Sequence, residues 1–259
     1  MGRVLTVVLL AAVGGWLALC AFAFAAQRAL LYPAPRARAP APRGTSFVEV
    51  PGGTSLLWSD AGAGAPVLVH FHGNAEQAAD LGFLAALLAR EGVSLAAVEY
   101  PGYAGAPGTP GEKSLVDACE RALLHLTGPR GVALARLSLS GQSLGSGVAV
   151  ALAARGWGTR LLLVSPYTSL PDVGARAFPW LPVRLLLRDR FDSAARAPSV
   201  RIPALVLHGT RDEVIPFDLG RALAARLPSA RFVPLEGAGH NDVWDAPAAL
   251  PEVLRFLGR

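Results

Sequence analysis

The chain has 259 residues, of which 52% are hydrophobic and 17% charged, so it holds enough apolar side chains for one globular domain with its own core. Its formal net charge of +5 comes from arginines spread along the chain, and this excludes the dense basic run of a nucleic-acid-binding arm. Two cysteines, Cys20 and Cys119, are too few for a disulfide framework or a thiolate metal site.

The first segment, residues 4–26, contains no charged side chain. As a helix it would be ~35 Å long, against ~30 Å for the hydrocarbon core of a bilayer, so it predicts a single-pass membrane anchor. A cleaved signal peptide is the alternative, because Arg3 precedes the run and small residues around Phe22 and Phe24 offer cleavage sites. We favour the anchor, since signal peptides usually have an apolar core of only about 7 to 15 residues.

A segment rich in proline and arginine follows, residues 27–44, and it predicts an extended linker that lifts the catalytic domain, residues 45–259, off the membrane. Arginines in this segment outnumber the positive groups before the anchor. That imbalance favours a cytoplasmic catalytic domain. Cleavage of the first segment would instead give a secreted domain.

The domain begins with apolar runs at 47–50 and 55–58 around the turn PGGT, which predicts a β-hairpin. Beyond the hairpin, short apolar runs typical of buried strands alternate with longer helical stretches. The predicted strands lie at 66–72, 94–100, 135–140, 160–165, 204–209 and 231–237, and the helices at 77–91, 112–127, 144–155 and 247–258. Such alternation indicates an α/β domain with a mostly parallel sheet covered by helices on both faces.

Polar residues collect after these predicted strands. Ser143, Asp212 and His240 each follow a strand, and His72-Gly73-Asn74 follow another. In open α/β sheets the ligand site lies beyond the carboxyl ends of the strands, so we expect these residues at one edge of the sheet.

The stretch LSLSGQSLGSG, residues 137–147, holds Ser143 between Gly141 and Gly145. A Gly-x-Ser-x-Gly pentapeptide also occurs by chance in ordinary loops. Here, however, a strand precedes it and a helix follows, which is the arrangement of a nucleophile elbow, where small neighbours allow a strained turn. The context therefore predicts Ser143 as a nucleophile and the amide of Leu144 as a donor to an oxyanion.

A serine nucleophile needs a base within hydrogen-bond reach and a carboxylate that orients the base. Of the five histidines, only His240 follows both the serine and a loop carboxylate, and its loop is rich in glycine. Asp212 and Glu213 alone directly follow a buried strand between the two; we select Asp212, with Glu213 as the fallback. We expect the other carboxylates at the surface or at helix caps, with Asp242 and Asp245 as caps of the last helix.

The second oxyanion donor is expected in the loop after 66–72. Gly73 lets the backbone approach a substrate closely, so the amide of Asn74 is the predicted partner of the Leu144 amide. A plain turn at the end of the strand is the alternative.

The motifs GQSLG, HGN, VEYPGY, SPYTSL, RDRFDS, LHGTRDEVIPF and EGAGHNDVW together resemble the α/β-hydrolase superfamily. The likeness is to its small, N-terminally membrane-anchored serine hydrolases, which include eukaryotic protein depalmitoylases. This resemblance covers about residues 28–259 and implies an α/β-hydrolase fold with eight mostly parallel strands and a triad of Ser143, Asp212 and His240. The sequence departs from the family at Glu76, where relatives often have glycine, so the shape of the oxyanion loop stays open.

These residues predict a serine hydrolase that cleaves carboxylic ester or thioester bonds of acyl or lipid-like substrates, with no cofactor and no metal. Residues 166–192 predict a small cap over an apolar acyl pocket, formed by Tyr167, Phe178, Trp180, Leu181 and Leu185. A serine peptidase or aminopeptidase of the same fold is the alternative, but we find no acidic pair to bind a substrate's amino group. A third possibility, a catalytically silent membrane-tethered binding module, is hard to reconcile with a complete triad.

Overall fold

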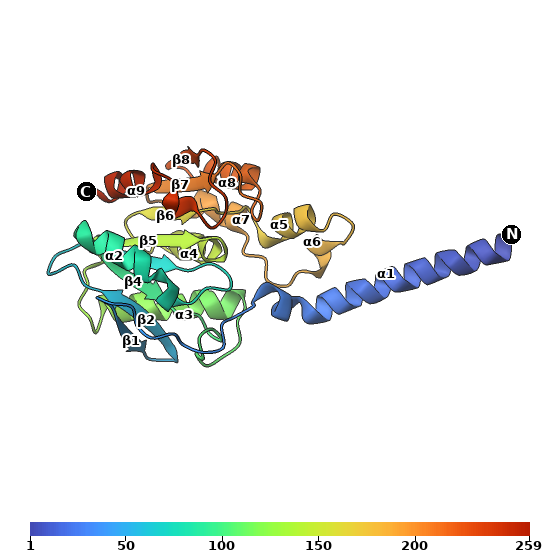
Figure 1. Ribbon diagram of the computed structural model, residues 1–259, viewed down its shortest axis with the longest axis horizontal. Helices are drawn as coiled ribbons and strands as arrows, with labels where there is room; N and C mark the ends of the chain where they lie inside the picture. The colour runs from blue at the N-terminus through green and yellow to red at the C-terminus, as the bar shows by residue number, and fades with distance from the viewer.

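The computed structural model describes all of residues 1–259 and contains one eight-stranded sheet between two layers of helices (Figure 1). The strands are β1 (Ser46–Val50), β2 (Thr54–Ser59), β3 (Val67–Phe71), β4 (Ser94–Val98), β5 (Leu137–Gln142), β6 (Leu161–Val164), β7 (Ala204–Gly209) and β8 (Ala230–Leu235). The α-helices are α1 (Gly2–Leu31), α2 (Gly82–Arg90), α3 (Glu112–Thr127), α4 (Leu144–Ala154), α5 (Leu170–Ala177), α6 (Val183–Leu186), α7 (Ser193–Arg196), α8 (Phe217–Ala224) and α9 (Ala249–Leu257). Single 3-10 turns occupy Ala78–Leu81, Leu134–Arg136, Ala197–Ser199 and Val243–Asp245.

The sheet has the strand order β1-β2-β4-β3-β5-β6-β7-β8. β2 runs antiparallel to both β1 and β4, and every other neighbouring pair is parallel. The predicted hairpin and the predicted eight-stranded, mostly parallel sheet are therefore confirmed. Because β3 to β8 are parallel, their carboxyl ends all open onto the same edge, which is where a site is expected.

The central strands are buried on both faces, which explains why they are almost continuously apolar in the sequence. Along β3, Val69 packs into a core shared with α3, α4 and α8, whereas its neighbour Leu68 packs into a second core with α2 and α9. Side chains of a strand point alternately to opposite faces, so one apolar run serves both cores. The helices cover the sheet as predicted.

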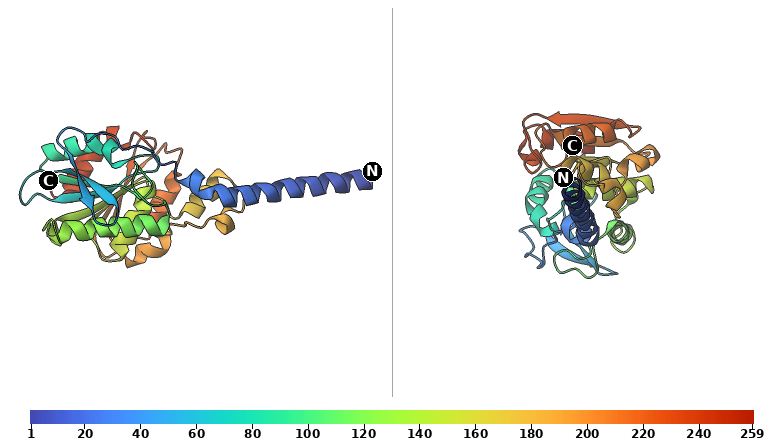
Figure 2. Two further views of the ribbon diagram at one scale, coloured as in Figure 1. Left: turned by 90° about the horizontal axis from the view of Figure 1, so that it is seen from below. Right: turned by 90° about the vertical axis from the view of Figure 1, so that its right-hand side faces the viewer.

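Helix α1 leaves the domain as a long rod whose amino-terminal part touches nothing else (Figures 1 and 2). It is the one helix in the structure that is long and apolar enough to cross a membrane, with a mean hydropathy of 2.4 over its most apolar window. The helix is longer than the predicted segment 4–26, because it continues to Leu31. Its last turns lie beside α5 and α6, and there Cys20 and Gln27 are buried.

The residues after α1 are those predicted as an extended linker that lifts the domain off the membrane. They run along the domain and bond to it: Ala104 donates its N–H to the Pro35 carbonyl, and Arg38 pairs with Glu49 at 2.8 Å. Proline keeps this segment extended, but its free carbonyls and arginines find partners on the sheet and its loops. The segment is thus bonded along the domain, and its role in lifting the domain off the membrane stays a prediction.

Candidate active site

Ser143 occupies a strained turn between β5 and α4. Its backbone has φ = 50° and ψ = −119°, a conformation that non-glycine residues rarely adopt. The Ser143 N–H donates to the Val164 carbonyl of β6, and Ser146 donates to the Ser143 carbonyl from both its N–H and its hydroxyl. These bonds hold the turn in place, and they leave the Ser143 hydroxyl at the carboxyl edge of the sheet.

Small residues around Ser143 are required by close backbone approaches. A Cβ on Gly141 would lie 2.2 Å from the Gly145 carbonyl oxygen, and a Cβ on Gly145 would lie 2.0 Å from the carbonyl oxygen of Phe71. Gly147 has equally little room, because its Cβ would lie 2.6 Å from the Tyr167 hydroxyl. Helix α4 thus packs directly onto β3 and β5, as the sequence predicts for an elbow.

Asp212 and His240 are in direct contact, although 28 residues separate them in the chain. Nδ1 of His240 lies 2.8 Å from Oδ2 and 3.0 Å from Oδ1 of Asp212. Asp212 follows β7, and His240 follows β8, the neighbouring parallel strand. With Nδ1 bound to the carboxylate, Nε2 of His240 stays free to act on another group. Glu213, the fallback carboxylate, is exposed and has no hydrogen bond to His240.

The carboxylate of Asp212 is fully buried yet ionised. Burial alone would raise its pKa, but hydrogen bonds from His208, His240 and the Ile215 N–H hold the pKa well below the usual range. The Val214 N–H adds a further bond at 3.0 Å, which closes a turn around the side chain. Asp212 is therefore a fixed negative charge that can stabilise a protonated imidazole.

The segments that carry Ser143 and His240 are joined by a contact that the sequence did not reveal. The indole N–H of Trp244 donates to the side-chain oxygen of Gln142 at 3.0 Å. Gln142 directly precedes Ser143, and Trp244 lies one turn beyond His240. The structure has no hydrogen bond between the Ser143 hydroxyl and His240. It joins Asp212 and His240 directly, and it links the histidine loop to the residue before Ser143 through the Gln142–Trp244 bond. Catalytic bonds of this kind are often long without substrate.

The predicted oxyanion loop, after β3, packs against the elbow. A Cβ on Gly73 would lie 3.7 Å from the Cβ of Ser143. The amide of Asn74 donates no hydrogen bond within the protein, and the amide of Leu144, the first residue of α4, has no partner within its helix. Both predicted donors are therefore free for a ligand.

Asn74 itself is held by its side chain. Its amide nitrogen donates to the Leu31 carbonyl at 2.6 Å, and its amide oxygen accepts from the Tyr103 hydroxyl at 2.8 Å. The last residue of α1 is thereby bonded to the loop that carries the predicted oxyanion donor.

Glu76, the departure from the family pattern, stabilises the same loop from within. Its carboxylate accepts the Gly73 N–H at 2.6 Å, across Ala75, which has φ = 60°. The carboxylate thus fixes the turn that carries the Asn74 amide.

A buried polar cluster supports the loop from below. His72 contacts Glu99 at 3.3 Å, and Glu99 also accepts the Ala78 N–H at 3.0 Å. The hydroxyl of Tyr100 donates to the His72 carbonyl at 2.8 Å. The side chains of the residues that end β3 and β4 therefore mostly support the loop, while Gly73 lies beside Ser143.

The remaining histidines are not placed as a base. His70 is fully buried, and burial together with the neighbouring His72 lowers its pKa to about 3, so it stays neutral. His208 is buried behind Asp212, 3.4 Å from its carboxylate and 3.0 Å from the Ile215 carbonyl. Sequence reasoning missed this second contact of Asp212, although the i, i+4 spacing of His208 and Asp212 was visible.

Three expectations for the other residues need correction. Asp242 accepts the Gly239 N–H within the histidine loop, and Asp245 lies in a 3-10 turn, so neither caps α9, which has no side-chain cap. Asp189 is buried, not at the surface, and accepts from Tyr32 at 2.9 Å. Tyr167 belongs to the core, because its hydroxyl donates to the Leu144 carbonyl.

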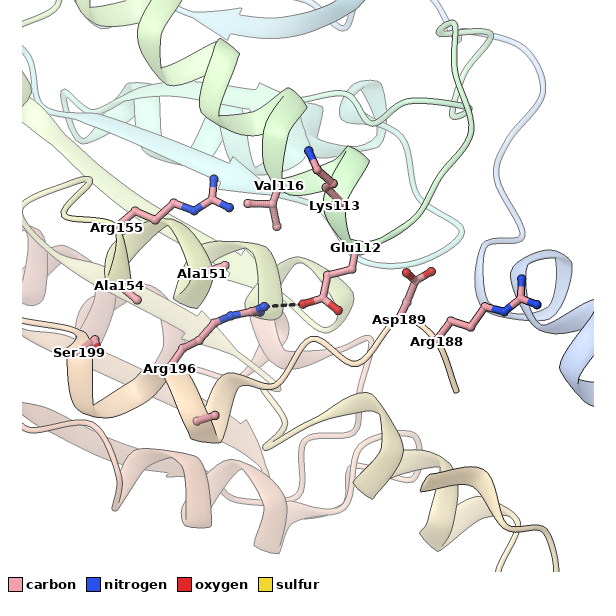
Figure 3. Close-up of a pocket in the computed structure, with 11 residues that line it drawn as sticks. Glu112, Lys113, Val116, Ala151, Ala154, Arg155, Arg188, Asp189, Arg196 and Ser199 are labelled. Atoms are coloured by element: carbon pink, nitrogen blue, oxygen red, sulfur yellow. Dashed lines mark hydrogen bonds and ion pairs between the residues drawn. The ribbon is translucent and has the colours of Figure 1, made fainter. Parts of the chain in front are cut away.

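Residues 166–192 form a small cap of α5 and α6, as predicted. Its carboxyl-terminal end is fixed by Glu112, whose carboxylate accepts the N–H groups of Arg190 and Phe191 and pairs with Arg196 at 2.6 Å. Figure 3 shows this pair on the wall of a polar cavity of about 590 Å³ between α3, α4 and α7. None of the predicted site residues lines it.

Comparison with known proteins gives consistent relatives. A family model described as TAP-like protein matches residues 188–258. The uncharacterized protein Rv2307c of Mycobacterium tuberculosis is 38% identical over 250 residues, which is 91% of this chain and 89% of that protein. Alpha/beta hydrolase domain-containing protein 17B of Homo sapiens is 37% identical over 182 residues, covering 68% of this chain and 60% of its own length. The esterase Pf2001 of Pyrococcus furiosus superposes with a TM-score of 0.70 at 18% identity, over 87% of this chain and 98% of the esterase.

Proposed function

Because this chain belongs to the α/β-hydrolase superfamily and is a hydrolase, we propose that it cleaves carboxylic ester or thioester bonds through an acyl-enzyme on Ser143. The proposed substrates are acyl or lipid-like molecules. The proposed catalytic residues are Ser143, His240 and Asp212, with the amides of Asn74 and Leu144 as oxyanion donors.

One observation carries the proposal. The His240 imidazole is bonded through Nδ1 to a buried, ionised Asp212, on a segment tied by Trp244 to the residue before a strained serine. An oriented imidazole with a free Nε2, on a segment bonded to the residue before a strained serine, supports a role as the base that makes this alcohol nucleophilic. Neither a structural role nor ligand binding alone requires this combination.

In the proposed reaction, Nε2 of His240 takes the hydroxyl proton of Ser143 while the Ser143 oxygen attacks the carbonyl carbon of the substrate. The carbonyl π electrons move onto oxygen, and the resulting oxyanion accepts hydrogen bonds from Asn74 and Leu144. Collapse of this intermediate breaks the ester or thioester bond, and the leaving alcohol or thiol takes the proton from His240. A water molecule then gives a proton to His240 and attacks the acyl-enzyme. The bond between the acyl group and Ser143 breaks, the serine oxygen takes the proton back from His240, and the carboxylic acid is released.

We propose further that α1 is a membrane anchor that stays on the protein. Its last turns bond to the catalytic domain through Gln27, whose side chain donates to the Leu186 carbonyl and accepts the Arg188 N–H. Trp16 donates to the Trp180 carbonyl at 3.1 Å. Cleavage near Phe22 or Phe24 would remove Trp16 and expose the apolar cap. These contacts favour a retained anchor over a signal peptide, and the arginines after it favour a cytoplasmic catalytic domain.

The test is labelling and turnover of the purified full chain. A fluorophosphonate probe should label the protein, and Ser143→Ala should abolish both labelling and hydrolysis of p-nitrophenyl butyrate. Ser146→Ala, a buried serine one turn away, is the matched control and should still be labelled. Labelling of the Ser143→Ala protein would refute the assignment, and an aminoacyl amide cleaved faster than every ester would favour the peptidase alternative.

A further inference from the structure

An apolar groove lies between the anchor helix and the cap. It has a volume of about 470 Å³, and 14 of its 16 lining residues are hydrophobic. One wall is the last half of α1, with Leu19, Phe22 and Ala23. The other is formed by α5, α6 and the loop between them, with Val173 of α5 and Leu181 of the loop. Its size is that of a site for a small organic ligand, and its chemistry suits a hydrocarbon chain.

The two walls are fixed relative to each other by polar contacts at both ends of the groove. At the outer end, Trp16 is bonded to the Trp180 carbonyl. At the inner end, the Tyr32 hydroxyl donates to the buried Asp189, and Gln27 bonds to the cap between them. Burial and the neighbouring Asp189 carboxylate raise the pKa of Tyr32, which keeps this hydroxyl protonated as the donor. The groove is therefore built into the structure and does not result from a loosely attached helix.

None of the candidate catalytic residues lines the groove, but its inner end is linked to the predicted oxyanion loop through Leu31. Leu31 lines the groove, and its carbonyl accepts the hydrogen bond from Asn74. On the other wall, Leu170 begins the cap just beyond the end of β6, the strand next to the one that delivers Ser143. A chain lying in the groove would thus have its inner end at the oxyanion loop.

The outer end of the groove lies at the level of the membrane. About 20 helical residues cross the hydrocarbon core, and α1 has 30. With α1 as the proposed anchor, its last third extends beyond the core beside the cap, while Trp16 and Leu19, at the outer end of the groove, lie just inside the core. Aromatic side chains favour this boundary, and Phe178 and Trp180 are exposed on the cap there. Arg188 stacks on Phe24 at 4.2 Å, which places a cation at headgroup depth. Figure 2 shows the cap alongside the base of the rod.

We propose that this groove binds the acyl chain of the substrate, with α1 as one of its walls, so that a lipid ester enters sideways from the bilayer. This inference rests on the proposed function. It gives the anchor a second role, because the helix that holds the enzyme at the membrane also selects the acyl chain. The exposed Leu185 of α6, in the cap, adds apolar surface for the lipid.

The first test measures kcat/KM for p-nitrophenyl esters from acetate to hexadecanoate, with the full chain in nanodiscs. Each methylene buried in the groove should raise kcat/KM about fourfold. Ala23→Trp and Val173→Trp fill the groove from opposite walls, and each should lower the value for hexadecanoate at least tenfold while changing that for acetate less than twofold. Ala25→Trp makes the same change on an exposed face of α1 that does not line the groove, and it should keep the wild-type profile.

The second test needs no turnover. Pyrene-labelled hexadecanoate should bind to Ser143→Ala protein, and the additional Ala23→Trp change should weaken this binding at least tenfold while Ala25→Trp leaves it unchanged. Equal binding with Ala23→Trp, or an unchanged chain-length profile, would overturn the groove as an acyl site. Absence of all ester turnover and labelling would refute the hydrolase proposal instead, and the binding assay would still decide the groove.

Discussion

Trp244 donates its indole N–H to the side-chain oxygen of Gln142, 3.0 Å away, and so joins the histidine loop to the nucleophile elbow. We predict that Trp244→Phe, which keeps the ring but removes the donor, lowers kcat about tenfold and leaves KM nearly unchanged. The reason is that the bond sets the position of His240 relative to Ser143 and does not contact substrate. Steady-state kinetics with p-nitrophenyl butyrate measure both constants.

A double-mutant cycle distinguishes positioning from general destabilisation. Gln142→Ala removes the acceptor, so the double variant should be no slower than the slower single variant. Fluorophosphonate labelling rates should fall in the same pattern, while the melting temperature changes little. Independent, multiplicative losses in kcat would show that the two side chains do not act through their mutual bond.

Because α4 lies so close to β3, we predict that no side chain is tolerated at Gly145. Gly145→Ala would put a Cβ 2.0 Å from the Phe71 carbonyl oxygen, and backbone cannot move aside as a flexible side chain would. Overpacking of this kind should lower the free energy of unfolding by about 3 kcal/mol and remove activity. Gly14→Ala, in a helix with nothing within 4 Å, should not destabilise. Urea unfolding of both variants measures the difference, and a stable, active Gly145→Ala enzyme would contradict the elbow geometry.

The oxyanion loop gives a third prediction. Glu76→Ala leaves the Gly73 N–H without its acceptor, so the loop can turn and the Asn74 amide loses its orientation. We expect kcat to fall roughly tenfold, in line with about 1–3 kcal/mol for an unsatisfied donor. Glu76→Gln keeps an oxygen acceptor and should retain most of the activity. Glu91→Ala, at an exposed position, is the control. Full activity of Glu76→Ala would mean that the loop is held by its other contacts alone.

Much of the fold was predictable because the signals are local. Apolar runs mark strands that are buried on both faces, and the helix at 112–127 is predicted with the bounds observed for α3. The order of serine, aspartate and histidine after successive strands also predicted that Asp212 and His240 meet, since parallel strands open at one edge.

What the sequence did not reveal are contacts between distant segments. Nothing near Trp244 indicates Gln142 as its partner. The proline-rich composition of residues 33–43 predicted an extended linker but not the hydrogen bonds that its backbone makes to the domain. The groove between α1 and the cap was not predictable for the same reason. The sequence shows that each wall is apolar, but only tertiary packing brings the two walls together.

We predict that Glu112 stabilises the folded protein at neutral pH and that this stabilisation is lost in acid. Its side chain is 18% exposed; burial would raise its pKa, but hydrogen bonds from the Phe191 N–H, Arg196 and the Arg190 N–H lower the pKa below its usual value. The folded state therefore binds this proton more weakly than the unfolded state, where the pKa is about 4.3. The stability that Glu112 contributes is fully present above that pH and is lost as the pH falls through the lower, folded value.

At pH 7, Glu112→Gln should lower the free energy of unfolding by about 2 kcal/mol. The difference from wild type should narrow below about pH 4, because the Glu112 carboxylate is then protonated and becomes neutral, as the Gln amide is at every pH. Urea unfolding of the full chain in detergent at pH 7, 5 and 3 measures this, with the exposed Glu213→Gln as a control that should match wild type throughout. A pH-independent gap would show that Glu112 acts through packing and not through its charge.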